Sequence, residues 1–266
     1  MKTTLDIIVD ATRARVMDAR RTTDMDVLFK RAQAAQVEVP PNRLRQALMS
    51  PDTVNIIAEF KRASPSKGVI NDRVDPTAVA QSYEAGGACA ISVLTEPDFF
   101  LGSLEDLRSV RRAVSLPILR KDFIIDELQI FEAAEAGADA ILLIVTVLQR
   151  DELLHMQSVA HKLGLDALVE VHTLNELEIA KDIDATLIGV NNRDLKSLEV
   201  SLDVSRELIP HAPPNVPMIA ESGLKSGDDL IGLRQLGYSG FLIGETLMQS
   251  GDPASSLRGL VGNSAS

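Results

Sequence analysis

The chain has 266 residues, of which 45% are hydrophobic and 3% aromatic, and it carries a formal net charge of −11. This length and composition are typical of a globular α/β enzyme with a substantial core. The scarcity of aromatic rings argues against base-stacking surfaces, and the negative charge disfavours nonspecific binding to nucleic acid or anionic membranes. A small anionic substrate therefore requires a local cluster of basic residues.

The single cysteine, Cys89, leaves no intrachain disulfide, and its apolar neighbours indicate a small core residue. The four histidines lack the spacing of metal-binding motifs, so we expect no metal site. Residues 1–21 lack the apolar core of a signal peptide, and the longest apolar run, 140–145, is too short to span a membrane. We therefore expect a cytoplasmic protein.

Residues 1 to about 50 are predicted to form helices that precede the first strand. Apolar residues recur at helical spacing from Leu5 to Val16, a second amphipathic stretch covers about 26–36, and a short helix is expected up to Leu48. This segment is too short for a good core of its own. We expect it to be an extension that packs on the main domain, so that the chain, 1–266, forms one domain.

From Val54 onward, apolar runs alternate with amphipathic segments. The runs expected to form strands are 54–60, 88–94, 117–121, 139–145, 166–171, 186–191, 217–221 and 239–244. The expected helices lie near 75–86, 103–114, 126–136, 149–163, 173–182, 203–209, 225–236 and 253–261. Eight such pairs predict an α/β fold with a parallel sheet closed into a (β/α)8 TIM barrel. A doubly wound sheet is the alternative, but its GxGxxG fingerprint is absent.

Catalytic groups in such a barrel lie at the carboxyl ends of the strands. The residues found there are Glu59, Lys61, Thr95, Glu96, Lys121, Thr146, Glu170, Asn191, Asn192, Arg193, Glu221, Ser222, Gly244 and Glu245. A structural ion pair explains any one of these charges taken alone. Three carboxylates and two lysines at one mouth, after strands that are otherwise apolar, predict a catalytic site.

Glycines after the seventh and eighth strands predict a phosphate site. Ser222-Gly223 and Gly244 precede helices, as in barrel enzymes that bind phosphate through backbone N–H groups, although ordinary tight turns are the alternative explanation. The loop 64–68, SPSKG, is expected to close over the site from the other side. Basic side chains that could attract an anionic substrate are Lys61, Arg62, Lys67, Lys121 and Arg193.

Several of these segments together resemble a known family. The sequence IAEFKRASPSKG at 57–68 strongly resembles the signature of indole-3-glycerol phosphate synthase. The similarity continues through PILRKDF at 117–123, LVEVH at 168–172, IGVNNRDL at 188–195, AESG at 220–223 and FLIG at 241–244. It covers essentially the whole chain, including the helical extension.

The resemblance implies a (β/α)8 barrel without cofactor or metal that acts in tryptophan biosynthesis. The implied reaction closes 1-(2-carboxyphenylamino)-1-deoxyribulose 5-phosphate to indole-3-glycerol phosphate, with loss of carbon dioxide and water. Carried over by motif, Lys121 is the general acid on the substrate ketone, and Glu170 is the acid/base of the later dehydration. Glu59 and Lys61 match residues that orient the substrate and manage its charge.

The remaining matched residues are implied to bind substrate. Asn191 and Glu221 match residues that hold the sugar hydroxyls and the ring. Arg193 and Ser64 match substrate-contacting positions, and Ser222, Gly223 and Gly244 match the phosphate site. Some members have Ser where this chain has Glu245, and a carboxylate cannot donate a hydrogen bond to phosphate. We therefore expect backbone contact there, with the Glu245 side chain turned away.

Three alternatives remain at this point. Another phosphate-binding barrel, such as an isomerase of phosphoribosyl compounds, would be expected to place Asp or Cys where this chain has Glu59 and Glu170. An inactive barrel that serves as a sensor or scaffold would be expected to lack Lys121 or Glu170. The helical extension is expected to cover the catalytic end of the barrel, with a plug at the opposite end as the alternative.

Overall fold

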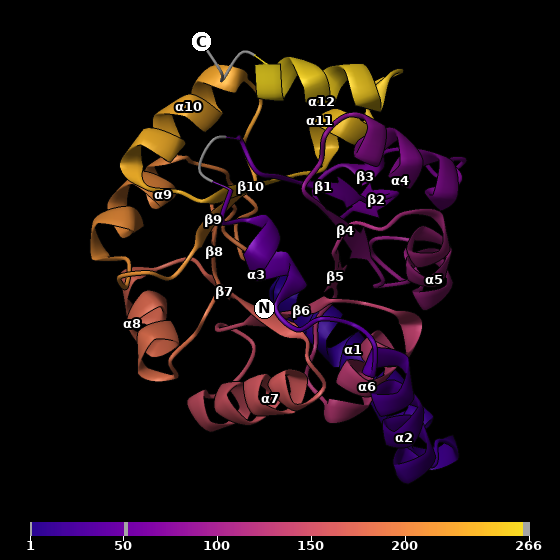
Figure 1. Cartoon of the computed structure of the whole chain (residues 1–266). Coiled ribbons are helices and arrows are strands. Elements are labelled where there is room, and N and C mark those ends of the chain that lie inside the picture. Colours follow the sequence, from indigo (N-terminus) through magenta and orange to yellow (C-terminus); the bar gives the residue numbers. More distant parts are fainter. Residues whose placement is uncertain (1, 51–52, 263–266) are drawn as a thin grey trace.

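A computed structural model of the chain describes residues 2–50 and 53–262. Its centre is a closed barrel of parallel strands in the order β1-β10-β9-β8-β7-β6-β5-β4, so the predicted (β/α)8 fold is confirmed (Figure 1). The strands are β1 (Ile56–Phe60), β4 (Ala90–Leu94), β5 (Ile118–Lys121), β6 (Ala140–Ile144), β7 (Asp166–Val171), β8 (Ile188–Asn191), β9 (Met218–Glu221) and β10 (Gly240–Ile243). All eight predicted strands are present.

Helices follow the barrel strands and form the outer layer (Figure 1). They are α4 (Pro76–Ala85), α5 (Leu104–Ala113), α6 (Glu127–Ala136), α7 (Arg150–Lys162), α8 (Leu174–Asp182), α9 (Asp203–Leu208), α10 (Gly227–Leu236) and α12 (Pro253–Gly262). Capping side chains such as Ser103 and Thr173 accept the first free backbone N–H groups. Gly137 ends α6 with a φ of 90°, a conformation that suits glycine and turns the chain into β6.

Short elements that the sequence did not predict lie in the connecting loops. Within the expected closing loop, β2 (Ala63–Ser64) and β3 (Gly68–Val69) pair as a small antiparallel hairpin. The 3-10 helix η1 (Ile209–His211) extends α9, and α11 (Glu245–Met248) follows β10 directly. Two of these elements, the hairpin and α11, adjoin the carboxyl end of the barrel.

Alternating side chains divide the core into two layers. Outward-facing residues of the strands, such as Ile91 and Val169, pack against the helices. Inward-facing residues, such as Ile57, Leu119 and Leu168, fill the barrel interior. The inner layer also includes apolar residues of the N-terminal extension, which therefore contributes to the barrel core.

The extension forms α1 (Thr4–Thr22), α2 (Met25–Gln36) and α3 (Arg43–Ala47). Its first helix places Leu5 and Ile8 against the pocket at the carboxyl ends of the strands. Next, α2 packs along α6, where the Phe29 and Phe131 rings lie 5.1 Å apart between centroids. The extension thus begins at the catalytic end, as expected.

The third helix lies at the opposite end of the barrel. Figure 1 looks onto that end, where α3 crosses the barrel opening. Leu48, just after α3, fills the space over Gly240 at the start of β10. The backbone N–H of Arg45 donates to Asp166 Oδ2, at the start of β7, over 3.0 Å. The alternative of a plug at the opposite end is therefore correct for α3. The expected position at the catalytic end is correct for α1.

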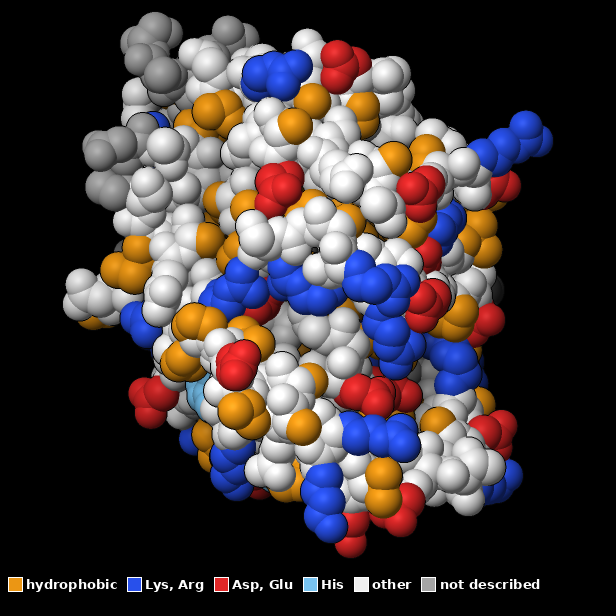
Figure 2. Space-filling view, turned by 45° about the vertical axis from the view of Figure 1, so that its right-hand side comes forward, with side chains coloured by type: hydrophobic (Ala, Val, Ile, Leu, Met, Phe, Trp, Pro, Cys, Tyr) orange, Lys and Arg blue, Asp and Glu red, His pale blue; other side chains and the backbone are white. Residues whose placement is uncertain are grey.

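Charges on the outer surface are mixed. Figure 2 shows a face on which Lys and Arg side chains gather in a band, with Asp and Glu side chains beside them. On α5, Arg111 pairs with Asp139, and Arg108 and Arg112 both pair with Glu105. The exposed pairs of Arg108 and Arg112 with Glu105 contribute little to stability individually, whereas Asp139 is buried beside Arg111. Within the part of the chain that the structure describes, no helix is both long and apolar enough to cross a bilayer.

Candidate active site

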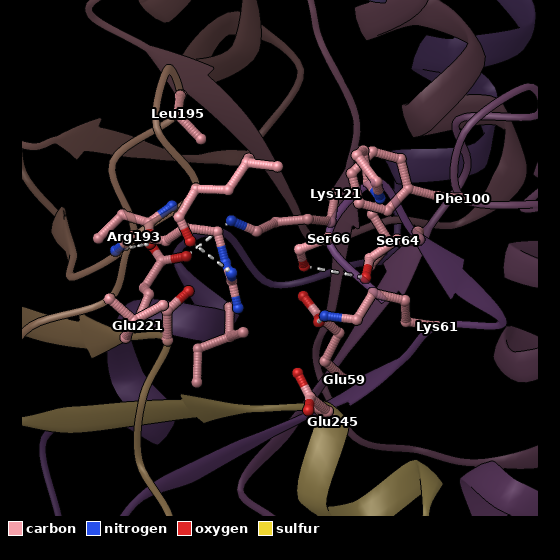
Figure 3. Close-up of a pocket in the computed structure, with 18 of the residues that line it drawn as sticks. Glu59, Lys61, Ser64, Ser66, Phe100, Lys121, Arg193, Leu195, Glu221 and Glu245 are labelled. Atoms are coloured by element: carbon pink, nitrogen blue, oxygen red, sulfur yellow. Dashed lines mark hydrogen bonds and ion pairs between the residues drawn. The ribbon is translucent and has the colours of Figure 1, made fainter. Parts of the chain in front are cut away.

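A cavity of about 410 Å³ opens at the carboxyl ends of the barrel strands. Every residue to which the family resemblance assigned a catalytic or substrate-binding role lines this cavity, and Figure 3 labels several of them. These residues are Glu59, Lys61, Ser64, Lys121, Glu170, Asn191, Arg193, Glu221, Ser222, Gly223 and Gly244. They come from the ends of β1, β5, β7, β8 and β9 and from the segments that follow β1, β8, β9 and β10, so the barrel brings together groups up to 185 positions apart (from 59 to 244).

Lys121 lies at the centre of the charged cluster. Its Nζ is 2.8 Å from Glu170 Oε2 and 2.6 Å from Glu221 Oε2, and Figure 3 shows it reaching across the pocket toward Glu221. All three side chains are buried. Burial lowers the pKa of Lys121, but the nearby carboxylates outweigh burial and raise its pKa above the ordinary value. The ammonium is therefore held protonated at neutral pH.

The two carboxylates beside Lys121 differ in their environment. Burial raises the pKa of Glu170, but Lys121 and His172 outweigh it, so its pKa is lowered overall. Burial raises the pKa of Glu221 to about 7. Lys121 offsets only part of that rise, and the negative charge of Glu170 adds to it. Among the residues that the structure describes, Glu221 Oε1 has no hydrogen-bond partner, and it is buried. Glu170 is thus the more stable anion, and Glu221 is the group that titrates near neutral pH.

Glu59 and Lys61 form a second ion pair on the adjacent wall. Lys61 Nζ lies 2.5 Å from Glu59 Oε1, which agrees with side chains two positions apart pointing the same way. Glu59 is 4% exposed, and Lys61 is the partner that offsets the cost of burying a carboxylate there. Lys61 and Lys121 therefore face the same cavity as the carboxylates of Glu59, Glu170 and Glu221.

An apolar wall lines the other side of the cavity. Leu5 and Ile8 of α1 face it together with Phe100, Leu142 and Ile144. The Phe100 ring lies 6.2 Å from that of Phe123, which also lines the cavity. The sequence pattern predicted the polar residues of the cavity but not this apolar wall. A signal was present in Phe100 and Phe123, because both follow barrel strands closely, at the same edge as the charged residues.

One corner of the cavity is lined by Ser222, Gly223 and Gly244 together with Lys67 and Lys225. Ser222 and Gly223 both have positive φ, 67° and 79°, which turns successive backbone groups in a tight bend. Such a bend with basic side chains beside it suits an anion.

Among residues 2–50 and 53–262, no group of three His, Cys, Asp or Glu side chains is arranged to bind a metal ion.

The amino-acid sequence matches known proteins over nearly its whole length. The family model for indole-3-glycerol phosphate synthase matches residues 5–260. An indole-3-glycerol phosphate synthase of Carboxydothermus hydrogenoformans is 47% identical over 261 residues, covering 97% of this chain and 99% of the relative. An indole-3-glycerol phosphate synthase of Rhodococcus jostii is 46% identical over 259 residues, covering 97% of this chain and 95% of the relative.

This chain belongs to the indole-3-glycerol phosphate synthase family. The expected enzyme class, a carboxy-lyase of tryptophan biosynthesis, is thereby confirmed. Among solved structures, a 3-hexulose-6-phosphate synthase of Salmonella typhimurium has a TM-score of 0.62 at 11% identity, with 78% of this chain and 96% of that chain covered. A thiamine phosphate pyrophosphorylase of Pyrococcus furiosus has a TM-score of 0.59 at 16% identity, with 82% of this chain and 95% of that chain covered. These likenesses show the shared barrel fold alone.

Two expectations about charged residues at the mouth were wrong. Arg62 points away from the cavity, pairs with Asp106 over 2.6 Å and packs over the Phe60 ring, because it alternates with Lys61 along the chain. Glu245 was expected to turn away, but it lines the cavity and lies 3.2 Å from Lys67. Lys67 of the hairpin therefore meets a carboxylate at the corner where phosphate was expected.

Several other polar residues at the strand ends have structural partners instead. Thr95 donates to Asp122, and Glu96 accepts backbone N–H groups of the loop after β4. Asn192 binds Ser205 and backbone carbonyls, and Thr146 is exposed. These residues hold the loops around the mouth.

Gly244 also provides space for Glu59. A Cβ atom built on Gly244 would collide with Glu59 Oε1 and lie 2.9 Å from its Cβ. We expect Gly244→Ala to displace the carboxylate and lower kcat/KM by about tenfold, since catalysis is sensitive to small displacements. The matched control is Gly232→Ala in α10, where a Cβ meets open space. Steady-state kinetics of both variants check this, and equal activities would show that Glu59 tolerates the shift.

Glu221 makes stability depend on pH. The unfolded chain ionises Glu221 near its ordinary pKa of 4.5, whereas the folded chain retains the proton up to about 7. The folded state therefore binds more protons between these values, and this contribution to stability is lost as pH rises. We expect Glu221→Gln to remove this loss. The free energy of unfolding of the variant should therefore rise relative to the parent by up to about 3 kcal/mol between about pH 5 and 8. Urea unfolding across that pH range measures the free energy of unfolding of both proteins. Parallel curves of this free energy against pH would contradict the prediction.

Proposed function

We propose that this cavity carries out ring closure, decarboxylation and dehydration of 1-(2-carboxyphenylamino)-1-deoxyribulose 5-phosphate within one site. The observation that carries the proposal is a buried Lys121 held between two carboxylates at the edge of an apolar wall. A positioned acid and fixed charges suit a reaction in which charge develops on a rigid skeleton. The apolar wall suits the aromatic ring of the substrate.

Lys121 donates its proton to the substrate ketone as the ring carbon attacks it. Glu59 and Lys61 orient the carboxylate and the ring nitrogen, and Lys61 neutralises part of the substrate charge. Decarboxylation then restores aromaticity, because the electron pair of the broken carbon–carbon bond returns to the ring. Glu170 exchanges the protons of the final dehydration, which removes the hydroxyl as water.

The remaining cavity residues hold the substrate in this proposal. Asn191 and Glu221 bind the sugar hydroxyls, and Arg193 and Ser64 contact the substrate near the mouth. Ser222, Gly223 and Gly244 bind the phosphate chiefly through backbone N–H groups. Phosphate that enters this corner also draws Lys67 away from Glu245, because a dianion attracts the ammonium more strongly than one carboxylate does.

The test is incubation of the purified protein with the ribulose phosphate while indole fluorescence is followed. Product formation that Glu170→Gln abolishes supports the proposal. A parent protein that binds the substrate without forming indole would favour a sensor or scaffold. Isomerised substrate without loss of carbon dioxide would favour a phosphoribosyl isomerase.

A further inference from the structure

His172 connects the buried acid/base residue with the protein surface. It follows Glu170 by two positions, so both side chains lie on the same side of β7 and its extension. His172 Nε2 lies 3.6 Å from Glu170 Oε1, on the oxygen that Lys121 does not occupy. The Nε2 atom is buried and has no hydrogen-bond partner within the described residues. The family resemblance described above implied no role for this histidine, although His172 ends the matched segment LVEVH.

The other ring nitrogen is held by Glu176 of α8. His172 Nδ1 lies 3.3 Å from Glu176 Oε2, and the same oxygen accepts the backbone N–H of His172 over 2.6 Å. Glu176 Oε1 accepts a hydrogen bond from the exposed Thr146 hydroxyl over 2.8 Å. The carboxylate is thus fixed from both sides, and it orients the imidazole so that Nε2 faces Glu170.

The reaction of this family takes up a proton. A substrate that loses an ionised carboxylate as neutral carbon dioxide, together with water, must take up one proton from solvent in each turnover. Glu170 is 2% exposed and is shielded by Lys121 on one side. The His172 side chain is 11% exposed, so its ring reaches from Glu170 toward solvent.

We propose that His172 is a positioning and proton-relay residue that delivers this proton to Glu170. The inference rests on the proposed role of Glu170. The imidazolium gives its Nε2 proton to the Glu170 carboxylate, and the electron pair of the N–H bond remains on nitrogen. The resulting carboxylic acid protonates the leaving hydroxyl as the carbon–oxygen bond breaks toward oxygen, which forms water. The neutral imidazole then regains a proton from solvent.

The charges around His172 favour this starting state. The groups that face it are Glu170 on β7, Glu176 on α8, Glu221 on β9 and Asp194 in the loop after β8. Burial lowers the pKa of His172, but Glu176, Glu170 and Glu221 outweigh it and raise its pKa above the ordinary value. The raised pKa of His172 and the lowered pKa of Glu170 favour an imidazolium beside a carboxylate.

The test compares His172→Asn with His155→Asn. His155 forms an exposed pair with Glu127 over 2.8 Å, so it is a matched histidine–glutamate pair outside the cavity. We expect His172→Asn to lower kcat about tenfold with KM within about twofold, and imidazole buffer to restore kcat in proportion to its concentration. His155→Asn should behave as the parent. A purely structural role for His172 would give no rescue.

Glu176→Gln provides a second, independent measurement. It keeps an acceptor for the His172 backbone but removes the charge that holds the imidazolium, so the alkaline decline of kcat should begin at lower pH than in the parent. A kcat of His172→Asn within about twofold of the parent, loss without imidazole rescue, or an unchanged pH profile of Glu176→Gln would each overturn the relay. Loss of indole formation in Glu170→Gln tests the proposed function separately.

Discussion

Lys121→Met should lose activity by about 10²–10⁴-fold in kcat while it still binds the substrate. Methionine keeps the approximate length of the side chain but cannot donate a proton to the ketone. The substituted side chain also leaves Glu170 and Glu221 facing each other without their shared cation. Two buried carboxylates in that position raise each other's pKa, so the variant should lose stability as pH rises and both ionise.

Three measurements separate catalysis from folding in this variant. Single-turnover fluorescence gives the chemical rate, equilibrium titration gives substrate affinity, and thermal unfolding gives stability. Lys181→Met is a suitable control, because Lys181 forms an exposed pair with Glu178 on α8. Turnover of Lys121→Met within a few-fold of the parent would exclude Lys121 as the general acid.

Ile8→Asp should lower kcat/KM by about 10²-fold, mostly through KM. Ile8 is 3% exposed, and it faces the cavity from α1. The substitution removes about 1.5–3 kcal/mol of apolar burial from the wall and adds an anion beside an anionic substrate. Steady-state kinetics with the ribulose phosphate measure the change, and circular dichroism checks that the variant remains folded.

Ile7→Asp is the matched control for this substitution, since Ile7 is the preceding residue of the same helix and is 47% exposed. It should leave kcat and KM near the parent values. Equal effects of the two substitutions would mean that α1 acts only through general stability. Unchanged kinetics in a folded Ile8→Asp protein would mean that α1 does not contribute to substrate binding.

Local patterns were sufficient to predict the barrel. Each barrel strand is a short apolar run, and residues such as Gly137 mark where a helix must end. These signals depend only on neighbouring residues. The hairpin of β2 and β3 was not predicted, because two-residue strands carry no periodicity. The position of α3 was not predicted either, since an apolar face shows that a helix is buried but not what it is buried against.

The site was predictable where its residues lie on strands. Alternation along β1 and the common edge of parallel strands place Glu59, Lys61 and Lys121 together without knowledge of the loops. Side chains in loops were less predictable. Glu245 turns toward Lys67 because the hairpin brings that lysine near β10, and a pairing between segments so far apart in sequence leaves no local signal.

The placement of α1 and α3 at opposite ends of the barrel has a consequence for how the chain folds. The side chain of Asn55 donates to the Ser239 carbonyl over 2.9 Å, Leu48 covers Gly240, and Arg20 of α1 binds Asp126. Ribosomes make α3 before the barrel, yet the surface that α3 and Leu48 cover is completed only when β10 emerges. We therefore expect α1 and α2 to dock once α6 is present and α3 to dock among the last, leaving its apolar face exposed during most of translation.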